Sequence, residues 1–405
     1  MIKTKKHLGV LVACCLLMAS SVGLCMNSVG IFYSPVAEAL GVGRGDVAMQ
    51  STLSGIAAGL VSPLIVRCYE RFNTKLCAIL GVAVTALTTG LMGAATSALQ
   101  LDILGLVRGV SYSFFSMIPV NMVLMHWFEH GYGLVTGFVF SFSGLGGVLF
   151  NSLLGGVIVD FGWRAGYLVV AGLILLLGVP SCFFISLPTR RRGKDGSGQS
   201  PEAARPAQGR RMLLSPMFIG LSVFTIGITF LIGFGQFIPD YAEEAGQGLA
   251  FGATMLSCAM VGNIVSKFLL GWLSDHRGPV FSTLIMVGSC TLGLFIMLVC
   301  GMTRANPAVL LAASVFFGGT YSITAVGISL VTRRFFGLER YGEAYGYISV
   351  LLNVGSALPF AVIGYSYDLF HTYRAAIWLC LGLCVAAAGI LAGLGRKAAK
   401  KEEKA

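Results

Sequence analysis

Charged residues are scarce in this chain of 405 residues. Only 11% of its residues are Asp, Glu, Lys or Arg, against roughly 25% in an average soluble domain. Hydrophobic residues, in contrast, make up 56%. A soluble fold has no interior large enough to hide so much apolar surface. The composition therefore excludes an ordinary globular domain and predicts a membrane protein.

The sequence also lacks the common motifs of enzymes and metal sites. It contains no Gly-x-Ser-x-Gly elbow, no His-Glu-x-x-His and no Gly-Lys-Ser/Thr phosphate loop. The 11 cysteines include no Cys-x-x-Cys pair, and their place in apolar runs is typical of small hydrophobes. No segment is long enough for a nucleotide-binding domain. We therefore expect no catalytic residue, no metal, no cofactor and a gradient as the driving force.

Long apolar runs are abundant, and about 20 such residues suffice to cross the hydrocarbon of a bilayer as a helix. We expect an uncleaved first helix, because the apolar stretch before Cys14 is only about six residues, too short for a leader. The sequence thus predicts an all-α membrane protein with 12 crossings. The runs lie at about 8–32, 47–66, 76–96, 101–125, 133–158, 165–186, 214–238, 250–273, 280–300, 307–331, 341–366 and 374–395.

The basic residues predict an orientation. Only four of the 28 Lys and Arg residues fall in the loops opposite the N-terminal side. Cytoplasmic loops are the ones enriched in Lys and Arg, so both termini are predicted to be cytoplasmic, in a plasma or inner membrane. The net charge of +11 sits in short clusters between apolar runs, which argues against a nucleic-acid partner.

Two parts of the sequence repeat one another. Trp127-Phe128 follows the fourth run and Phe335-Phe336 follows the tenth, 208 positions later. Asp160 and Asp368 are separated by the same offset. Transporters built from such parallel repeats bind substrate between two moving halves. We predict a six-helix half over residues 1–187, a basic linker over 188–212, a second six-helix half over 213–395 and a basic tail over 396–405.

The clearest motif is Gly271-Trp272-Leu273-Ser274-Asp275-His276-Arg277-Gly278. It resembles the G-x-L-x-D-R/H-x-G loop of the major facilitator superfamily, and the resemblance extends over essentially the whole chain. The copy at 66–75 is degenerate, with Glu70 in place of the Asp. The resemblance implies the major facilitator fold and a conformational motif; the alternative is a surface turn carrying ordinary topology charges. The motif residues are Glu70, Arg71, Gly271, Asp275, His276 and Gly278.

Within that superfamily, the segment 27–35 and the spacing Lys267-x-x-x-Gly271 are similar to the oxalate/formate and monocarboxylate exchangers. In that branch the position of Lys267 is commonly Arg and contacts a carboxylate substrate. Members of the oxalate/formate group often have a lysine in the eleventh helix. This chain has no such lysine in the corresponding run, next to Asn353. The resemblance implies a small, monocarboxylate-like anion as substrate.

Two basic residues, Arg108 and Lys267, fall inside predicted crossings, whereas no acidic residue lies near the middle of one. Charge in hydrocarbon is costly and commonly functional, so the pair predicts a cavity that attracts anions. Each cation has an alternative role, snorkelling to an interface or bonding a neighbouring helix. Polar residues expected to support the site, each of which interhelical hydrogen bonding alone also explains, are Asn27, Tyr112, Asn121, Asn263, Tyr321 and Asn353.

The sequence therefore predicts a secondary transporter with alternating access that moves a small organic anion. No histidine lies centrally in a run, which favours exchange, or symport in which the substrate carries the proton. The alternatives are an exporter of drug-like or hydrophobic compounds and a transporter-like sensor that binds without moving its ligand. The expected partners are the anionic substrate and the bilayer, and the expected state is a monomer.

Overall fold

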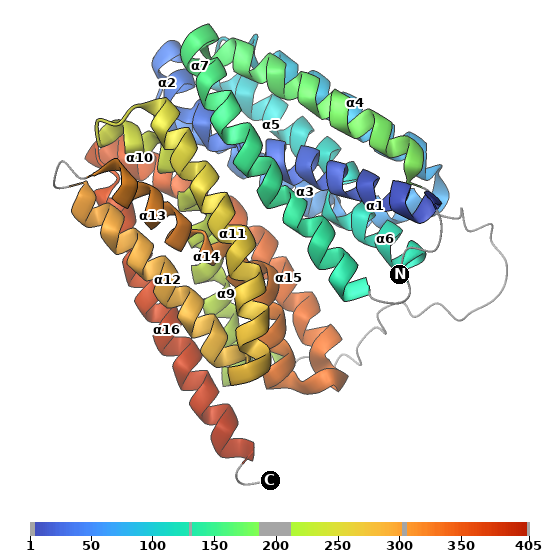
Figure 1. Ribbon diagram of the computed structural model, residues 1–405, viewed down its shortest axis with the longest axis vertical. Helices are drawn as coiled ribbons and strands as arrows, with labels where there is room; N and C mark the ends of the chain where they lie inside the picture. The colour runs from blue at the N-terminus through green and yellow to red at the C-terminus, as the bar shows by residue number, and fades with distance from the viewer. Residues whose placement is uncertain (1–4, 129–131, 186–211, 302–305, 403–405) are drawn as a thin grey trace. The chain divides into compact units, whose positions relative to one another are not determined.

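The computed structural model describes residues 5–128, 132–185, 212–301 and 306–402, and within these ranges it contains helices and short turns only (Figure 1). A helix satisfies every backbone N–H and C=O inside its own segment, which the hydrocarbon of a bilayer demands. Asn73, Ser97 and Asn306 begin three of the helices by accepting a hydrogen bond from the backbone two or three residues later.

The number of crossings agrees with the sequence. Ten helical stretches of the described chain are long and apolar enough to span a membrane. One of them, Val135–Phe184, has 50 residues and turns back at Gly162, where φ is +82°, so it holds two crossings. The 28-residue helix Arg44–Arg71 has no charged residue between Asp46 and Arg67 and provides another. The prediction of 12 crossings is confirmed.

The chain divides into two compact units. One comprises residues 1–193, 236–260 and 360–371, and the other 194–235, 261–359 and 372–405. The predicted linker falls largely outside the described residues, so the boundaries of the predicted halves stay a prediction. The predicted tail continues the last helix as far as Glu402.

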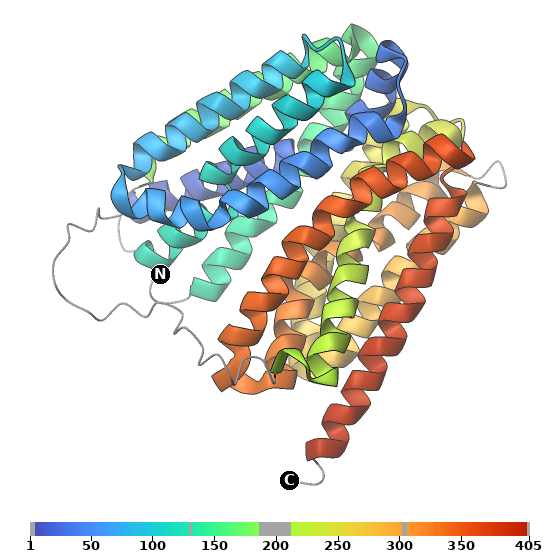
Figure 2. The ribbon, with the colours of Figure 1, turned by 180° about the vertical axis from the view of Figure 1, so that it is seen from behind.

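In the first unit, α3 packs on α5, α4 on α5 and α7, and α1 on α7 (Figure 1 and Figure 2). Close approach depends on glycine. A Cβ built on Gly109 would stand 2.1 Å from the Ser54 carbonyl oxygen, so only Gly permits this α3–α5 contact. The helices of this unit are α1 (Lys5–Met18), α2 (Tyr33–Leu40), α3 (Arg44–Arg71), α4 (Thr74–Met92), α5 (Ala98–Tyr112), α6 (Met117–Trp127), α7 (Tyr132–Phe184) and α10 (Ile238–Glu244).

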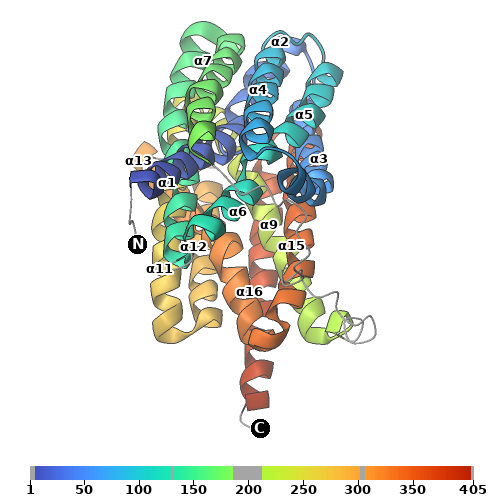
Figure 3. The same ribbon diagram turned by 90° about the vertical axis from the view of Figure 1, so that its right-hand side faces the viewer.

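In the second unit, α12 packs on α13 and α16, and α16 also packs on α9 (Figure 3). Gly293 of α12 would bring a Cβ within 2.6 Å of the Ala313 carbonyl oxygen, so small residues again set the helix spacing. The helices of this unit are α9 (Pro216–Gly235), α12 (Pro279–Cys300), α13 (Pro307–Phe317), α14 (Gly319–Ser322) and α16 (Arg374–Glu402). Two further helices, α11 (Leu249–Arg277) and α15 (Ile328–Phe370), contribute residues to both units.

Four crossings of the described chain are interrupted, and these are the first, fourth, seventh and tenth. The first changes from α1 to a π-helix over Ala19–Leu24, then breaks before a 3-10 turn at Val29–Phe32. The fourth breaks at Ser116 between α5 and α6, and the seventh between α9 and α10. The tenth continues from α14 into a π-helix. Substrate sites of transporters are typically formed at discontinuous helices, where unwound backbone can bind a ligand.

Candidate functional site

Arg108 is the most deeply embedded cation of the first unit. It lies on α5 with an exposed fraction of 4%. Its guanidinium donates to the sulfur of Met92 at 3.6 Å, and its Nε has no hydrogen-bond partner among the described residues. No carboxylate of the described chain forms an ion pair with it. A buried charge without a counter-ion is expensive, so this guanidinium has capacity to bind an anion.

Two hydrogen-bonded tyrosines of the first unit lie in the neighbourhood of Arg108. Tyr33 and Tyr167 both lie within electrostatic range of its charge. The Tyr33 hydroxyl donates to Ser51 Oγ at 2.8 Å, and Gln50 Nε2 donates to the Tyr167 hydroxyl at 3.4 Å. These groups come from α2, α3 and α7. Together with the cation they form a polar cluster in an otherwise apolar bundle, which suits a small polar ligand.

Asn27 lies at the break in the first crossing. Its exposed fraction is 7%, and its amide donates to the Ser143 carbonyl of α7 at 3.1 Å. Tyr112 of α5 donates to the sulfur of the adjacent Met26 at 3.3 Å, and Arg108 is within electrostatic range of this tyrosine too. The structure therefore brings Asn27, Tyr112 and Arg108 into one region of the first unit. Asn121 is half-buried on α6.

Lys267 is half-buried on α11, and neither a hydrogen bond nor an ion pair joins it to a described residue. The sequence places it about six residues from the inner end of its run, but α11 continues to Arg277. Lys267 is thus about ten residues, or roughly 15 Å, from the helix end. Asn263, one turn earlier, is 3% exposed and lies on the same face of α11. The last three residues of α11, from Asp275 on, are charged or polar and exposed, so the added helix length does not place Lys267 deeper in the bilayer, and snorkelling stays an alternative.

Tyr321 lies in α14, directly before the π-helix of the tenth crossing, and is 8% exposed. Its hydroxyl packs against Gly235 of α9, where a Cβ would come within 2.6 Å. Tyr112 and Tyr321 are 209 positions apart, within one position of the 208-residue offset of the sequence repeat, so the two tyrosines occupy matching places in the fourth and tenth crossings. The side chain of Asn353 is outside the part of the chain that the structure describes.

The conformational motif differs in local structure from the sequence-based expectation. We expect a short loop, but Gly271, Asp275 and His276 all lie within α11, and Gly278 alone makes the turn with a φ of +85°. His276 contacts the Trp272 carbonyl oxygen at 2.8 Å. Asp275 is exposed and bonds no described residue in this conformation. Arg71 ends α3 and is exposed, and the Glu70 side chain lies outside the described set.

The sequence analysis missed Asn151, which lies on α7 with an exposed fraction of 0%. Neither its Oδ1 nor its Nδ2 has a described hydrogen-bond partner. Ser143, Gly147 and Asn151 follow one another at a spacing of four on one face of α7, and the first two contact Asn27. Buried amides normally find partners. Asn151 therefore has donor and acceptor capacity available beside the break in the first crossing.

A second missed feature is a polar cluster of the first unit, here termed the Arg44 cluster, which joins the first half of the sequence to the second. Asp368 of α15 accepts backbone hydrogen bonds from Arg44 at 2.9 Å and Gly45 at 2.8 Å. It thereby caps the N-terminus of α3, where the helix dipole favours a carboxylate. The cluster comprises Ser34, Arg44, Gly45, Asp46, Asp240, Glu243, Tyr365, Tyr367 and Asp368.

The Arg44 side chain adds to these contacts. It is 3.5 Å from a Glu243 oxygen and 4.0 Å from an Asp240 oxygen of α10, and its guanidinium lies 4.3 Å from the centre of the Tyr367 ring. Asp240 has an exposed fraction of 0%. The cluster therefore contains a fully buried carboxylate in a short helix at the end of the seventh crossing, rather than in the middle of a crossing.

Comparison with known proteins identifies the class. The sequence model of the Major Facilitator Superfamily matches residues 15–358, and the chain belongs to that family. It is thus a multi-pass integral membrane protein and a secondary transporter of small molecules, and the prediction that it is not an enzyme is confirmed.

Several known transporters are similar to this chain in sequence or in structure. Monocarboxylate transporter 11 of Mus musculus is 26% identical over 92% of this chain and 83% of its own length. Monocarboxylate transporter 13 of Bos taurus is 24% identical over 90% and 82%. The crystal structure of a mutant form of the nucleoside transporter NupG covers 96% of this chain and 100% of its own, with a TM-score of 0.79 and 11% identity. The last similarity confirms the predicted all-helical fold.

Proposed function

We propose that the chain transports a small, monocarboxylate-like organic anion by alternating access. The observation that carries the proposal is Arg108, a buried guanidinium with no described counter-ion, which has Tyr33 and Tyr167 within electrostatic range. A positive site in a low-dielectric surrounding attracts an anion strongly. The similarity to monocarboxylate transporters over about 90% of the chain supports this substrate class.

In this proposal Lys267 contributes a second positive charge, and Asn27, Tyr112 and Tyr321 orient the substrate from the interrupted crossings. We assign a supporting role along the substrate path to Asn121, Asn263 and Asn353. Transport proceeds by exchange or by symport with a proton. The orientation proposed places both termini in the cytoplasm, in a plasma or inner membrane, with the protein acting as a monomer. The contacts of the Arg44 cluster within the first unit are proposed to form in one conformation of the transport cycle and to separate in another.

Counterflow in proteoliposomes tests the proposal directly. The purified chain is reconstituted with a monocarboxylate inside, and uptake of labelled mono- and dicarboxylates and of an uncharged amide analogue is measured. Faster uptake of the monocarboxylate than of the amide supports an anion transporter. Proton release or uptake during net flow separates symport from exchange. Preference for a hydrophobic cation would indicate the exporter, and binding without any flux would indicate the sensor; either result overturns the proposal.

Asn151→Leu is expected to lower anion affinity about 3- to 10-fold while raising thermal stability. The amide has no described partner, so replacing it with an apolar residue of similar volume removes the cost of an unsatisfied buried group, roughly 1–3 kcal/mol. The melting temperature of the purified variant tests the expected rise in stability, and its anion affinity tests the expected fall in binding. Ser141→Leu on the exposed face of α7 is the control. A variant that loses stability and keeps its affinity would assign Asn151 a purely structural role.

Asp275→Asn is expected to slow exchange severalfold with normal insertion and an unchanged anion affinity. Its carboxylate is exposed and bonds no described residue, so its partner belongs to another conformation and the charge acts on the equilibrium between states. Exchange rates at equal membrane protein level provide the measurement. Glu70→Gln, at the degenerate copy, is expected to change the rate less. Wild-type exchange in the Asp275 variant would contradict the role.

A further inference from the structure

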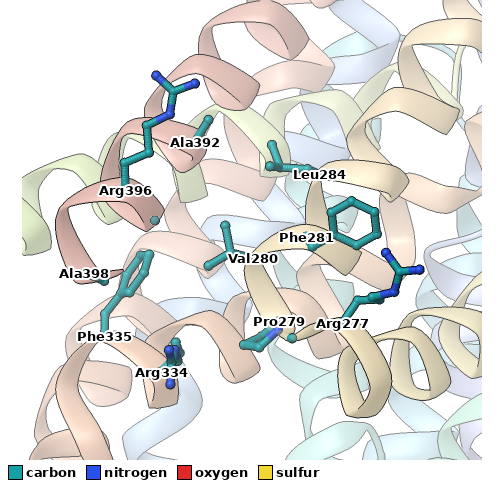
Figure 4. Close-up of a pocket in the computed structure, with 12 residues that line it drawn as sticks. Arg277, Pro279, Val280, Phe281, Leu284, Arg334, Phe335, Ala392, Arg396 and Ala398 are labelled. Carbon is teal, nitrogen blue, oxygen red and sulfur yellow. The ribbon is translucent and has the colours of Figure 1, made fainter. Parts of the chain in front are cut away.

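The second unit contains a basic cavity unrelated to the proposed substrate site. Its volume is about 670 Å³, and it lies where the turn between α11 and α12 meets α15 and the end of α16. Arg277, Arg334 and Arg396 stand around it, and no acidic residue of the described chain lines it. Figure 4 shows these arginines on three different helices at the edge of the cavity, with the Arg277 and Arg396 side chains extending outward from it. Such a concentration of positive charge matches an anion.

The floor of this cavity is apolar. Val280, Phe281 and Leu284 of α12 and Phe335 of α15 line it between the arginines (Figure 4). The Arg277 guanidinium lies 5.9 Å from the centre of the Phe281 ring, so the charge remains beside an apolar wall. A site for a soluble anion needs hydrogen-bond donors on most sides. This cavity instead presents charge at its edge and hydrocarbon at its base.

An apolar groove continues from the cavity along α12 and α16. It has a volume of about 500 Å³ and shares Leu284 with the basic cavity. Leu292, Phe295 and Val385 line it with exposed fractions of 45%, 54% and 68%. Gly288 lies in its wall, and a Cβ built there has no atom within 4 Å. Both helices are candidate membrane spans, so the groove faces hydrocarbon rather than water.

We infer that the basic cavity and the groove together bind one anionic phospholipid. The phosphate lies among the arginines, and one acyl chain follows the groove from Leu284 towards Phe295. The two lining surfaces are continuous, and their chemistry changes from cationic to apolar in the same order as that of a lipid. Basic pockets between membrane helices are known to hold anionic headgroups. The inference concerns a ligand other than the transported one and holds whatever the substrate is.

Lipid binding to the purified full-length chain tests the headgroup part. Native mass spectrometry of the protein in detergent, titrated with phosphatidylglycerol or phosphatidylcholine, gives the affinity for each lipid. Near a membrane surface each Arg contributes about a fivefold gain in affinity for anionic lipid. Arg277→Gln with Arg396→Gln is therefore expected to weaken phosphatidylglycerol binding about 25-fold. Arg333→Gln removes a neighbouring exposed charge that does not line the cavity, and is expected to stay within about twofold.

A second pair of variants tests the acyl-chain part. Gly288→Phe fills the groove without a backbone clash and is expected to reduce binding of phosphatidylglycerol about tenfold. Gly382→Phe, at an equally open glycine outside the groove, is expected to change nothing. Inorganic phosphate is added as competitor. Displacement of the lipid by millimolar phosphate, or unchanged binding in both the arginine and the Gly288 variants, overturns the lipid site.

Discussion

Arg108→Gln is expected to weaken binding of a monocarboxylate about 10- to 150-fold, because one charge-assisted hydrogen bond is worth about 1.5–3 kcal/mol. Arg108 is 4% exposed and has no described counter-ion, so little in the empty protein compensates its charge. Binding of an uncharged amide analogue is expected to change far less. Stability without ligand is expected to stay level or rise, since the variant no longer buries an uncompensated cation.

The measurement is the affinity of each purified variant for the monocarboxylate, determined by calorimetry. Lys267→Gln is measured in the same way. Lys267→Arg is expected to keep part of the affinity, because it retains the positive charge. Arg164→Gln, which removes an exposed charge at the α7 turn, is the control. If both Gln variants bind the anion within about twofold of the natural protein, the charges are structural and the anion proposal loses its main support.

Asp368→Asn is expected to shift the protein towards a state in which the contacts of the Arg44 cluster are separated, by about tenfold in population or more. The carboxylate accepts backbone hydrogen bonds from both Arg44 and Gly45. Asn has a single uncharged acceptor, so the variant loses at least one charge-assisted bond of about 1.5–3 kcal/mol. A conformation in which the cluster is separated lacks those bonds. Their loss in the variant therefore favours that conformation.

The rate at which a membrane-impermeant thiol reagent labels Ser34→Cys reports on this opening. Ser34 is buried and contacts Glu243 within the cluster, so a thiol there reacts when the cluster separates. Asp160→Asn is the matched control, because Asp160 is the sequence counterpart of Asp368, is exposed, and has no described bond. Equal labelling rates with and without the Asp368→Asn substitution would mean that the contact does not control opening.

The sequence predicts the crossings well because hydrophobic length is a local property. It identifies Arg108 for a similar reason, since a charge within an apolar run stands out without knowledge of the fold. It does not predict where α11 ends, because the apolar run ends near Leu273 whereas backbone hydrogen bonding carries the helix to Arg277. Polar residues at a helix end need not lie outside the helix.

Other features depend on tertiary contacts and leave no local signal. Asn151 is one amide in a run of Gly, Leu and Val, and only the packed structure shows that its side chain has no described partner. Asp240 reads as a carboxylate near a helix end, yet packing excludes solvent from it completely. Asp368 bonds residues more than 300 positions earlier. No periodicity or propensity predicts such a pairing.

The break in the first crossing has a consequence for biosynthesis. Asn27 donates to Ser143, 116 positions later, and the Gly30 N–H donates to Gln236, 206 positions later. Unsatisfied backbone and amide groups cannot remain in lipid, and the ribosome adds about 5–20 residues per second. The first crossing therefore lacks its last hydrogen-bond partner for on the order of 10 seconds or more during synthesis. Until then the membrane-insertion machinery or bound water must shield a segment that is synthesised long before its hydrogen-bond partners.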